Sequence, residues 1–336
     1  MAQDIHTLLA MENTHPDYHK HEFAESILTG LTAKQKYIPA EYHYDAEGSR
    51  LFDRITELPE YYITKCEIDA LRNNRDIIAE FLGEGAVNII EFGPGDGKKT
   101  RSLVDHFLKL DLDFRYVAVD ISHSALTQLA DDYRARFPKL DFDCLVSNYA
   151  SGLKWLNDRY GQRNLVLFLG SSIGNFSREQ TDTFLKSLHD ELNAGDLALI
   201  GFDLVKDEEL IRKAYNDAQN VTSEFNLNLL RRINRELAGN FHLDGFRYTG
   251  RYSHAEKALK SYLISLKNQE VEIDALQKTI YFERDEAIHT EDSRKYSESD
   301  IERLANRNGF SVMANLYDSK RYFVDSIWEV RKPIIN

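Results

Sequence analysis

Residues 87–100 read VNIIEFGPGDGKKT, and this segment gives the clearest indication of the fold. VNIIEF is an apolar run of the length of a buried strand, and it ends at the glycines Gly93 and Gly95. Helical spacing follows from Lys98 to Leu110, and a second short apolar run, YVAV, spans Tyr116 to Val119. A strand, a glycine-rich turn, a helix and another strand in this order predict a βαβ unit.

The same alternation continues downstream. Residues 124–137 and 178–192 have helical spacing, and apolar runs occur near residues 142–146, 165–169 and 197–202. Repeated strands and helices of these lengths are typical of sheets whose two faces are covered by helices. We therefore predict an α/β fold with a Rossmann-like, doubly wound and mostly parallel sheet.

The pattern changes after about Lys206. Two long helical stretches, residues 207–218 and 222–237, are followed by the strand-like segments ALKSYLISL (258–266) and TIYFE (279–283). Helices followed by alternating strands indicate an inserted α+β domain. We predict four segments, namely 1–62 contributing to a substrate domain, 63–205 as the core, 206–290 as the inserted substrate-binding domain, and 291–336 as the return to the core.

The return segment contains one predicted helix and two predicted strands. Ser299 is expected to begin the helix, with Glu302 as its partner in a capping box. Residues 311–317 and 322–330 are expected to form two final strands that complete the sheet.

Composition excludes several classes of protein. The chain has 336 residues, of which 42% are hydrophobic, and this content suffices for folded cores. Its formal charge of −13 without a basic block disfavours a nucleic-acid partner. The N-terminus lacks the pattern of a secretory signal, and no apolar run reaches the length of a membrane span, so we expect a cytoplasmic protein without a membrane partner. We also expect a monomer.

Cysteine and histidine usage gives no sign of a metal site. Cys66 and Cys144 show no CxxC spacing and have no companion ligands, which fits free thiols in a reducing compartment. Four histidines crowd the N-terminus, namely His6, His15, His19 and His21. They include no helical i, i+4 pair framed by carboxylates, so we predict that the protein has no metal.

The glycine-rich segment carries the cofactor signal. Glu91 ends the first strand, and Gly93, Gly95 and Gly97 follow with G-x-G-x-G spacing. A dinucleotide-binding fold prefers G-x-G-x-x-G. The acidic strand end followed by G-x-G-x-G instead resembles motif I of class I methyltransferases, which bind S-adenosylmethionine. A purely structural tight turn is the alternative interpretation of the motif.

Three further candidate positions lie at the ends of the next two strands. Asp120 ends the second strand, where a carboxylate can accept hydrogen bonds from both ribose hydroxyls of an adenosine. This position favours a nucleoside without choosing between a dehydrogenase and a methyltransferase. Asn148 and Tyr149 follow the third strand, where methyltransferases often carry an acidic or amide residue for the adenine amino group and an aromatic neighbour for the ring.

Longer segments carry a more specific resemblance. They are YIPAEYHYDAEGSRLFDRITELPEYY (37–62), FLGSSIGN (168–175) and DLVKD (203–207). Together they closely resemble the histidine-specific Nα-methyltransferases of ergothioneine biosynthesis. The similarity runs in the same order from about Leu31 to nearly the C-terminus.

The resemblance implies methylation of the α-amino group of L-histidine by S-adenosylmethionine, in up to three transfers that give hercynine. It implies a catalytic position near the amine for Tyr44, and substrate contacts for Phe52, Tyr61, Gly170, Asn175, Tyr215, Thr222, Glu291 and Ser293. It implies cofactor contacts for Gly93, Gly95, Lys99, Asp120, Asn148 and Tyr149. Asn175 and Tyr215 would hold the substrate carboxylate, and Glu291 with Ser293 would engage the imidazole nitrogens.

Two positions depart from the family pattern. Asn148 stands where the family often has Asp, and it keeps an acceptor oxygen. Ser261 stands where a larger apolar residue such as Met is expected, which leaves open a different substrate such as tryptophan. A catalytically silent binding protein with the cofactor fold is another alternative. A nucleic-acid amine methyltransferase is disfavoured, because LGSSIGN (169–175) replaces the proline- and aromatic-rich loop that holds a flipped base.

Overall fold

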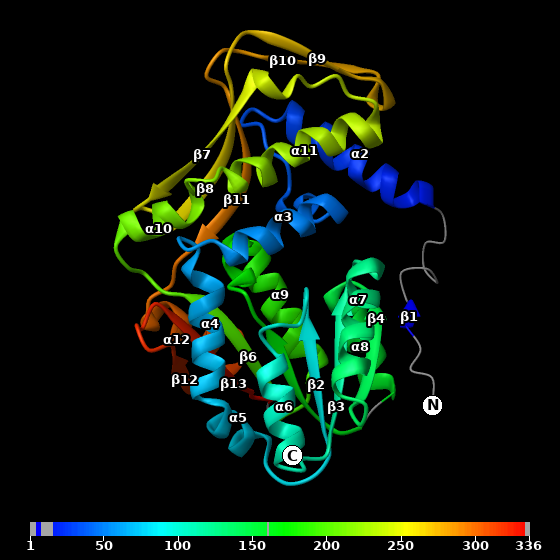
Figure 1. The fold of residues 1–336 in the computed structure, drawn as a ribbon, viewed down its shortest axis with the longest axis vertical. Coiled ribbons are helices and arrows are strands. Elements are labelled where there is room, and N and C mark those ends of the chain that lie inside the picture. The colour runs from blue at the N-terminus through cyan, green and yellow to red at the C-terminus, as the bar shows by residue number, and fades with distance from the viewer. Residues whose placement is uncertain (1–4, 8–15, 160, 333–336) are drawn as a thin grey trace. The chain divides into compact units, whose positions relative to one another are not determined.

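The computed structural model describes residues 5–7, 16–159 and 161–332, which fall into two compact units (Figure 1). Unit 1 takes in strand β1 (Ile5–Thr7) and the described parts of 63–205 and 295–336. Unit 2 takes in the described part of 14–62 together with 206–294. No helix in these described ranges has the length and apolar character needed to cross a membrane.

Unit 1 is built on an eight-stranded sheet with the order β1-β4-β3-β2-β5-β6-β13-β12. The strands after β1 are β2 (Val87–Phe92), β3 (Phe114–Asp120), β4 (Asp141–Val146), β5 (Arg163–Phe168), β6 (Leu197–Asp203), β12 (Phe310–Tyr317) and β13 (Phe323–Val330). Strands β1 to β6 pair in parallel, and β13 pairs antiparallel with β6 and β12. Every position of β2 and β6 is buried, as expected for parallel strands covered on both faces.

Helices cover both faces of this sheet. They are α4 (Tyr62–Asn73), α5 (Arg75–Leu82), α6 (Arg101–Lys109), α7 (His123–Arg136), α8 (Tyr149–Arg159), α9 (Arg178–Glu191) and α12 (Glu298–Arg307). One apolar core joins the sheet to α5, α6 and α7, and a second joins it to α8, α9 and α12. The predicted doubly wound, mostly parallel fold is therefore confirmed. The strand order reverses between β2 and β5, and ligands of such folds bind at the carboxyl ends of the strands there.

The predicted start of the last helix is wrong by two residues. Helix α12 is capped by Ser297 and not by Ser299, with Asp300 as the capping-box partner in place of Glu302. Both Ser-x-x-acid patterns are present in the sequence. Ser297 has the extended backbone that a cap requires, and the carboxylate of Asp300 accepts a hydrogen bond from its N–H at 2.9 Å.

Unit 2 combines helices with two small antiparallel sheets, β11-β8-β7 and β10-β9. The strands are β7 (Phe246–Ser253), β8 (Ala258–Ser265), β9 (Gln269–Ile273), β10 (Lys278–Phe282) and β11 (Ala287–Arg294). The main helices are α2 (Pro16–Thr32), α3 (Ala46–Glu57), α10 (Glu208–Tyr215) and α11 (Val221–Leu237). Apolar side chains of α2 and α11 form its core together with residues from all five strands.

Strand β11 was not among the predicted strands, and it contains the predicted segment boundary at residue 291. The structure keeps residues 291–294 in unit 2, because β11 pairs with β8 through Arg294. Its sequence, AIHTEDSR, lacks the regular alternation of apolar residues that marks a strand. A bulge between His289 and Glu291 also shifts the register, which explains why the pattern was missed.

Candidate active site

The glycine-rich loop leaves the carboxyl end of β2 at the centre of the sheet. Gly93, Gly95 and Gly97 have φ values of +64°, +57° and +67°, which residues other than glycine rarely adopt. A Cβ on Gly95 would have no atom within 4 Å, so a ligand has room beside this backbone. A Cβ on Gly97 would lie 2.5 Å from Cδ1 of Leu129, so the third glycine serves close packing against α7.

Buried polar side chains of the neighbouring strands and of α7 hold this loop in its conformation. The carboxyl group of Glu91 is buried, which raises its pKa, and the hydroxyl of Tyr116 donates a hydrogen bond to it. Tyr133 stacks on Tyr116 at a ring distance of 5.4 Å and donates to the carbonyl of Gly97 at 3.0 Å. The loop conformation is therefore held by side chains of β3 and α7.

Asp120 stands at the end of β3, as predicted. One of its carboxylate oxygens accepts the backbone N–H of Ser122 at 2.9 Å. Burial raises the pKa of Asp120, but the residue keeps partial exposure at the sheet edge. This arrangement leaves acceptor capacity for ligand hydroxyls.

Asn148 and Tyr149 lie where β4 gives way to α8. The side-chain oxygen of Asn148 accepts the N–H of Ser151 at 2.9 Å, in the manner of a helix cap. The ring of Tyr149 stacks on Phe92 with 4.7 Å between centroids, and its hydroxyl lies 3.5 Å from the position of a Cβ on Gly93. The structure thus brings Tyr149 next to the glycine-rich loop.

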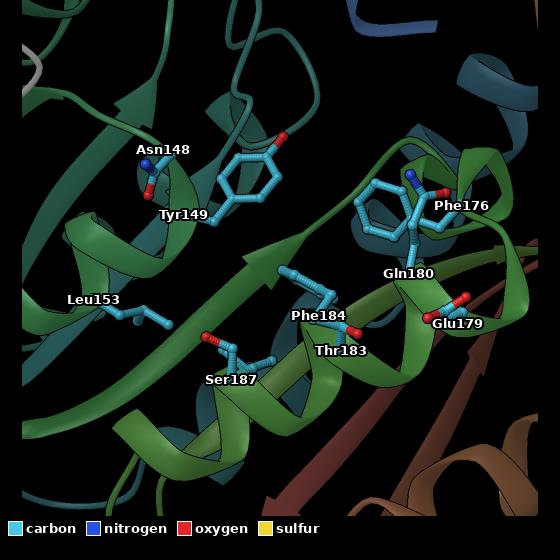
Figure 2. Close-up of a pocket in the computed structure, with 10 residues that line it drawn as sticks. Asn148, Tyr149, Leu153, Phe176, Glu179, Gln180, Thr183, Phe184 and Ser187 are labelled. Atoms are coloured by element: carbon cyan, nitrogen blue, oxygen red, sulfur yellow. The ribbon is translucent and has the colours of Figure 1, made fainter. Parts of the chain in front are cut away.

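A cavity of about 550 Å³ opens beside Asn148 and Tyr149 (Figure 2). Its other lining residues come mainly from α9 and are Leu153, Phe176, Glu179, Gln180, Thr183, Phe184, Ser187 and Leu188. Aromatic and aliphatic walls with a few polar groups suit a flat heterocycle. The cavity therefore offers space for an aromatic base next to two of the predicted cofactor residues.

Lys99 and Gly170 meet at a buried carboxylate. The Nζ of Lys99 lies 2.9 Å from Oε2 of Glu67, and the backbone N–H of Gly170 donates to Oε1 of Glu67 at 2.5 Å. Burial alone would lower the pKa of Lys99, but the charge and hydrogen bonding of Glu67, together with the charges of Glu91 and Asp325, outweigh burial and raise that pKa. Lys99 is therefore held as a cation at the carboxyl end of β5.

Asn175 ends a short turn, η2 (Ser172–Asn175), that follows Gly170. Ser171 begins this turn in the left-handed conformation with φ 56°, and its hydroxyl oxygen accepts the N–H of Asp203 at 3.0 Å. The loop is thereby fastened to the end of β6. Asn175 is half-buried.

In unit 2, an aromatic cluster contains Tyr44, Phe52, Tyr61, Tyr215 and Phe225. Successive ring centroids lie 5.6 Å apart for Tyr44 and Phe52, 6.4 Å for Phe52 and Tyr61, and 6.2 Å for Tyr61 and Tyr215. Phe225 is buried and packs against Tyr44 and Phe52 at 5.8 and 6.0 Å. Four predicted site residues therefore come together, and Tyr44 remains 39% exposed.

The polar residues of β11 adjoin this cluster. The hydroxyls of Ser293 and Tyr215 share a hydrogen bond of 2.5 Å. Glu291 lies two residues before Ser293 and so projects from the same face of the strand. Ser261 on β8 pairs directly with Glu291 on β11. The hydroxyl of Ser261 lies 3.3 Å from that of Tyr248. The bulge before Glu291 sets this alignment.

Thr222 lies in the first turn of α11. Its backbone N–H donates to Asp217 at 2.9 Å, but its buried hydroxyl has no hydrogen-bond partner within the described part of the chain. A buried hydroxyl left unpaired is costly. This atom therefore fits a contact with a bound ligand.

Sequence reasoning missed two residues of this arrangement. Phe225 falls in the predicted helix 222–237, and its helical spacing does not distinguish it from an ordinary core residue. Glu67 gave no signal, since it sits alone on α4 in a segment without a motif. Only the three-dimensional neighbourhood reveals either of them.

The described ranges contain no group of three or more histidine, cysteine or acidic residues that could hold a metal ion. Of the N-terminal histidines, His15 and the side chains of His6 and His19 lie outside the described residues. Cys66 and Cys144 are both buried, and neither forms a disulfide within the described residues.

A glycine-rich loop, an acidic residue at the end of β3 and a central lysine, on a doubly wound sheet with a reversed last strand, define a methyltransferase of the Rossmann-like class. The model of the family described as "Histidine-specific methyltransferase, SAM-dependent" matches residues 23–330. The chain belongs to this family.

Three relatives illustrate its range. A histidine N-alpha-methyltransferase of Mycolicibacterium smegmatis is 36% identical over 82% of this chain and 84% of its own length. Ergothioneine biosynthesis protein 1 of Neurospora crassa is 31% identical over 83% of this chain, which spans only 32% of that longer protein. A 4-dimethylallyltryptophan N-methyltransferase of Claviceps purpurea is 29% identical over 57% of this chain and 58% of its own.

Proposed function

We propose that this protein methylates the α-amino group of L-histidine with S-adenosylmethionine, and that it does so up to three times to give hercynine in the ergothioneine pathway. The family match over residues 23–330 supports the reaction and its substrate. The paired hydroxyls of Ser293 and Tyr215, with Glu291 on the same strand face, are the observation in this chain that supports histidine best.

The residues of unit 1 fit the cofactor. The space beside Gly95 admits a ligand close to the backbone, and Asp120 has acceptor capacity for ribose hydroxyls. The cavity beside Asn148 and Tyr149 suits the adenine ring. Lys99 would pair with the carboxylate of the methionine part. The bound cofactor supplies an electrophilic methyl group on a sulfonium.

The substrate residues have to present an amine lone pair in line with that methyl group. Asn175 and Tyr215 would hold the α-carboxylate, and the hydroxyl of Tyr44 would lie near the amine. Aromatic rings suit this position, since each transfer removes a hydrogen-bond donor and the final quaternary cation still interacts with π faces such as that of Phe52. Gly93, Gly170, Tyr61 and Thr222 complete the proposed contacts.

Recognition of the imidazole is assigned to Glu291 and Ser293. A carboxylate accepts an imidazole N–H, and a hydroxyl can serve the second ring nitrogen. An indole has one donor and no acceptor, so this pair of polar groups favours histidine over tryptophan.

Tryptophan is the second candidate substrate. Ser261, a small buried residue, lies opposite Glu291 in the strand pair and leaves more room than Met would. The relative from Claviceps purpurea carries a tryptophan derivative in its name.

We further propose that the protein works as a monomer in the cytoplasm, on a small molecule, without a nucleic-acid or membrane partner. Two buried cysteines that form no disulfide within the described residues fit a reducing compartment, and the net charge of −13 disfavours nucleic acid. Sedimentation of the purified protein tests the monomer, and a dimer would refute that part.

A screen of the common amino acids for release of S-adenosylhomocysteine tests the proposed substrate. Histidine should give by far the highest turnover. Turnover of tryptophan without turnover of histidine would replace the assignment. If calorimetry detects binding of neither S-adenosylhomocysteine nor histidine, the protein is a silent relative.

A further inference from the structure

The buried residue Glu67 on α4 makes contacts that join two parts of the proposed site. Its side chain has no exposed surface, and each carboxylate oxygen faces a different element. Oε2 lies 2.9 Å from Nζ of Lys99, beyond the glycine-rich loop, and Oε1 accepts the N–H of Gly170 at 2.5 Å. One carboxylate thus restrains a side chain after β2 and the backbone after β5.

The surrounding backbone is shaped to admit this carboxylate. A Cβ on Gly201, in β6, would lie 2.5 Å from Oε1 of Glu67. A Cβ on Gly170 would lie 2.8 Å from Nζ of Lys99, at a backbone φ of +79°. Two glycines, one in the turn after β5 and one in β6, therefore make room for the ion pair.

Other buried acidic groups interact by charge with the Glu67–Lys99 ion pair. Asp325, on β13, is fully buried, and no atom in the described ranges hydrogen-bonds to either of its oxygens. Burial raises the pKa of Asp325 well above its ordinary value, and the nearby charge of Glu67 raises it further. The charge of Glu91 also raises the pKa of Lys99, and the charge of Asp318 also raises the pKa of Asp325.

We propose that Glu67 is a positioning residue for methyl transfer, which holds the Lys99 ammonium and the Gly170 amide in fixed places through its two carboxylate oxygens. Charge-assisted bonds of this kind restrict a long, flexible side chain to one orientation. Lys99 is thereby oriented toward the cofactor, and the turn from Gly170 to Asn175 is held at its first residue. This inference rests on the roles given to Lys99 and Gly170 in the proposed function.

Titration calorimetry with S-adenosylhomocysteine tests the proposal without requiring turnover. Glu67→Gln should raise the dissociation constant about tenfold, which corresponds to the loss of one charge-assisted contact. Because Glu67 acts through Lys99, the same change in a Lys99→Met background should add less than about twofold. Equal effects in both backgrounds, or an unchanged constant in Glu67→Gln, would overturn the proposal.

Asp196→Asn is the matched control. Asp196 is also a buried carboxylate of unit 1 that accepts backbone N–H groups, from Asn164 and Asn193, but it lies before β6 at the other end of that strand. Asp196→Asn should lower the midpoint of urea unfolding and leave the binding of S-adenosylhomocysteine unchanged. If it weakens binding as much as Glu67→Gln does, both effects reflect core stability, and the positioning role is wrong.

Hydrogen exchange adds a readout that needs no ligand. In Glu67→Ala, the amide of Gly170 loses its acceptor and should exchange faster than in the wild type, while amides of β2 keep their protection. Unchanged exchange at Gly170 would contradict the proposal. A wild type that binds S-adenosylhomocysteine but does not methylate histidine would refute the proposed function instead, and the titrations would still decide the role of Glu67.

Discussion

The residues proposed for the cofactor in unit 1 and those proposed for the substrate in unit 2 are arranged in different ways. In unit 1, the contacts come from strand ends and a glycine-rich loop, whose conformation buried groups such as Glu91 and Tyr133 hold. In unit 2, they come from aromatic rings and polar side chains on three separate segments. In the proposed function, cofactor binding thus depends on a fixed backbone, whereas substrate choice depends on a few side chains.

The largest predicted effect concerns the pH dependence of the free energy of unfolding, and it comes from a histidine beside the aromatic cluster. His43 is fully buried and stacks on Phe225 at 4.5 Å, and burial lowers its pKa to about 4. Between about pH 6.5 and pH 4, His43 is therefore protonated in the unfolded chain but not in the folded chain. The free energy of unfolding falls as the pH falls through this window. The loss should approach about 3 kcal/mol in urea titrations.

The variant His43→Asn should lose this part of the pH dependence. His254→Asn is the control, since His254 is largely exposed and should leave the slope as in the wild type. An unchanged slope in His43→Asn would mean that other groups cause the acid sensitivity.

Asp120→Ala tests the cofactor region. Loss of the acceptors for the ribose hydroxyls should weaken S-adenosylhomocysteine binding by roughly 1.5–3 kcal/mol, with little change in folding. Asp141→Ala, at the start of the neighbouring strand β4, should bind normally. Equal affinities for Asp120→Ala and the wild type would exclude Asp120 from the ribose site.

Glu291→Ala tests substrate choice. It should cost histidine about 1.5–3 kcal/mol in kcat/KM and improve the relative standing of tryptophan. Asp292→Ala is a close control, because the neighbouring carboxylate pairs with His289 at 2.9 Å on the other side of β11. If both variants keep the wild-type ratio of histidine to tryptophan, Glu291 does not recognise the imidazole.

Asn175→Ala should separate the two ligands. An anchor for the substrate carboxylate affects histidine alone, so the KM for histidine should rise roughly tenfold, or about 1.5 kcal/mol. The dissociation constant of S-adenosylhomocysteine should stay near that of the wild type. A similar loss for both ligands would make Asn175 a structural residue of its turn.

The two regions also differ in how far the sequence predicts them. The βαβ pattern and the G-x-G-x-G spacing are contiguous, so the sheet and positions such as Asp120 follow from local rules. Glu291 and Ser293 lie on a bulged strand with an irregular pattern, and only the family resemblance pointed to them. Glu67 and Phe225 remained hidden, because a single buried acid or a helical Phe has no distinctive spacing.

Mass spectrometry of histidine incubated with the protein and S-adenosylmethionine is the decisive experiment for the proposed reaction. We expect successive products with one, two and three added methyl groups, with fragmentation that places all of them on the α-nitrogen and none on the imidazole. Unmodified histidine alongside methylated tryptophan, or methyl groups on the ring, would contradict the proposed reaction.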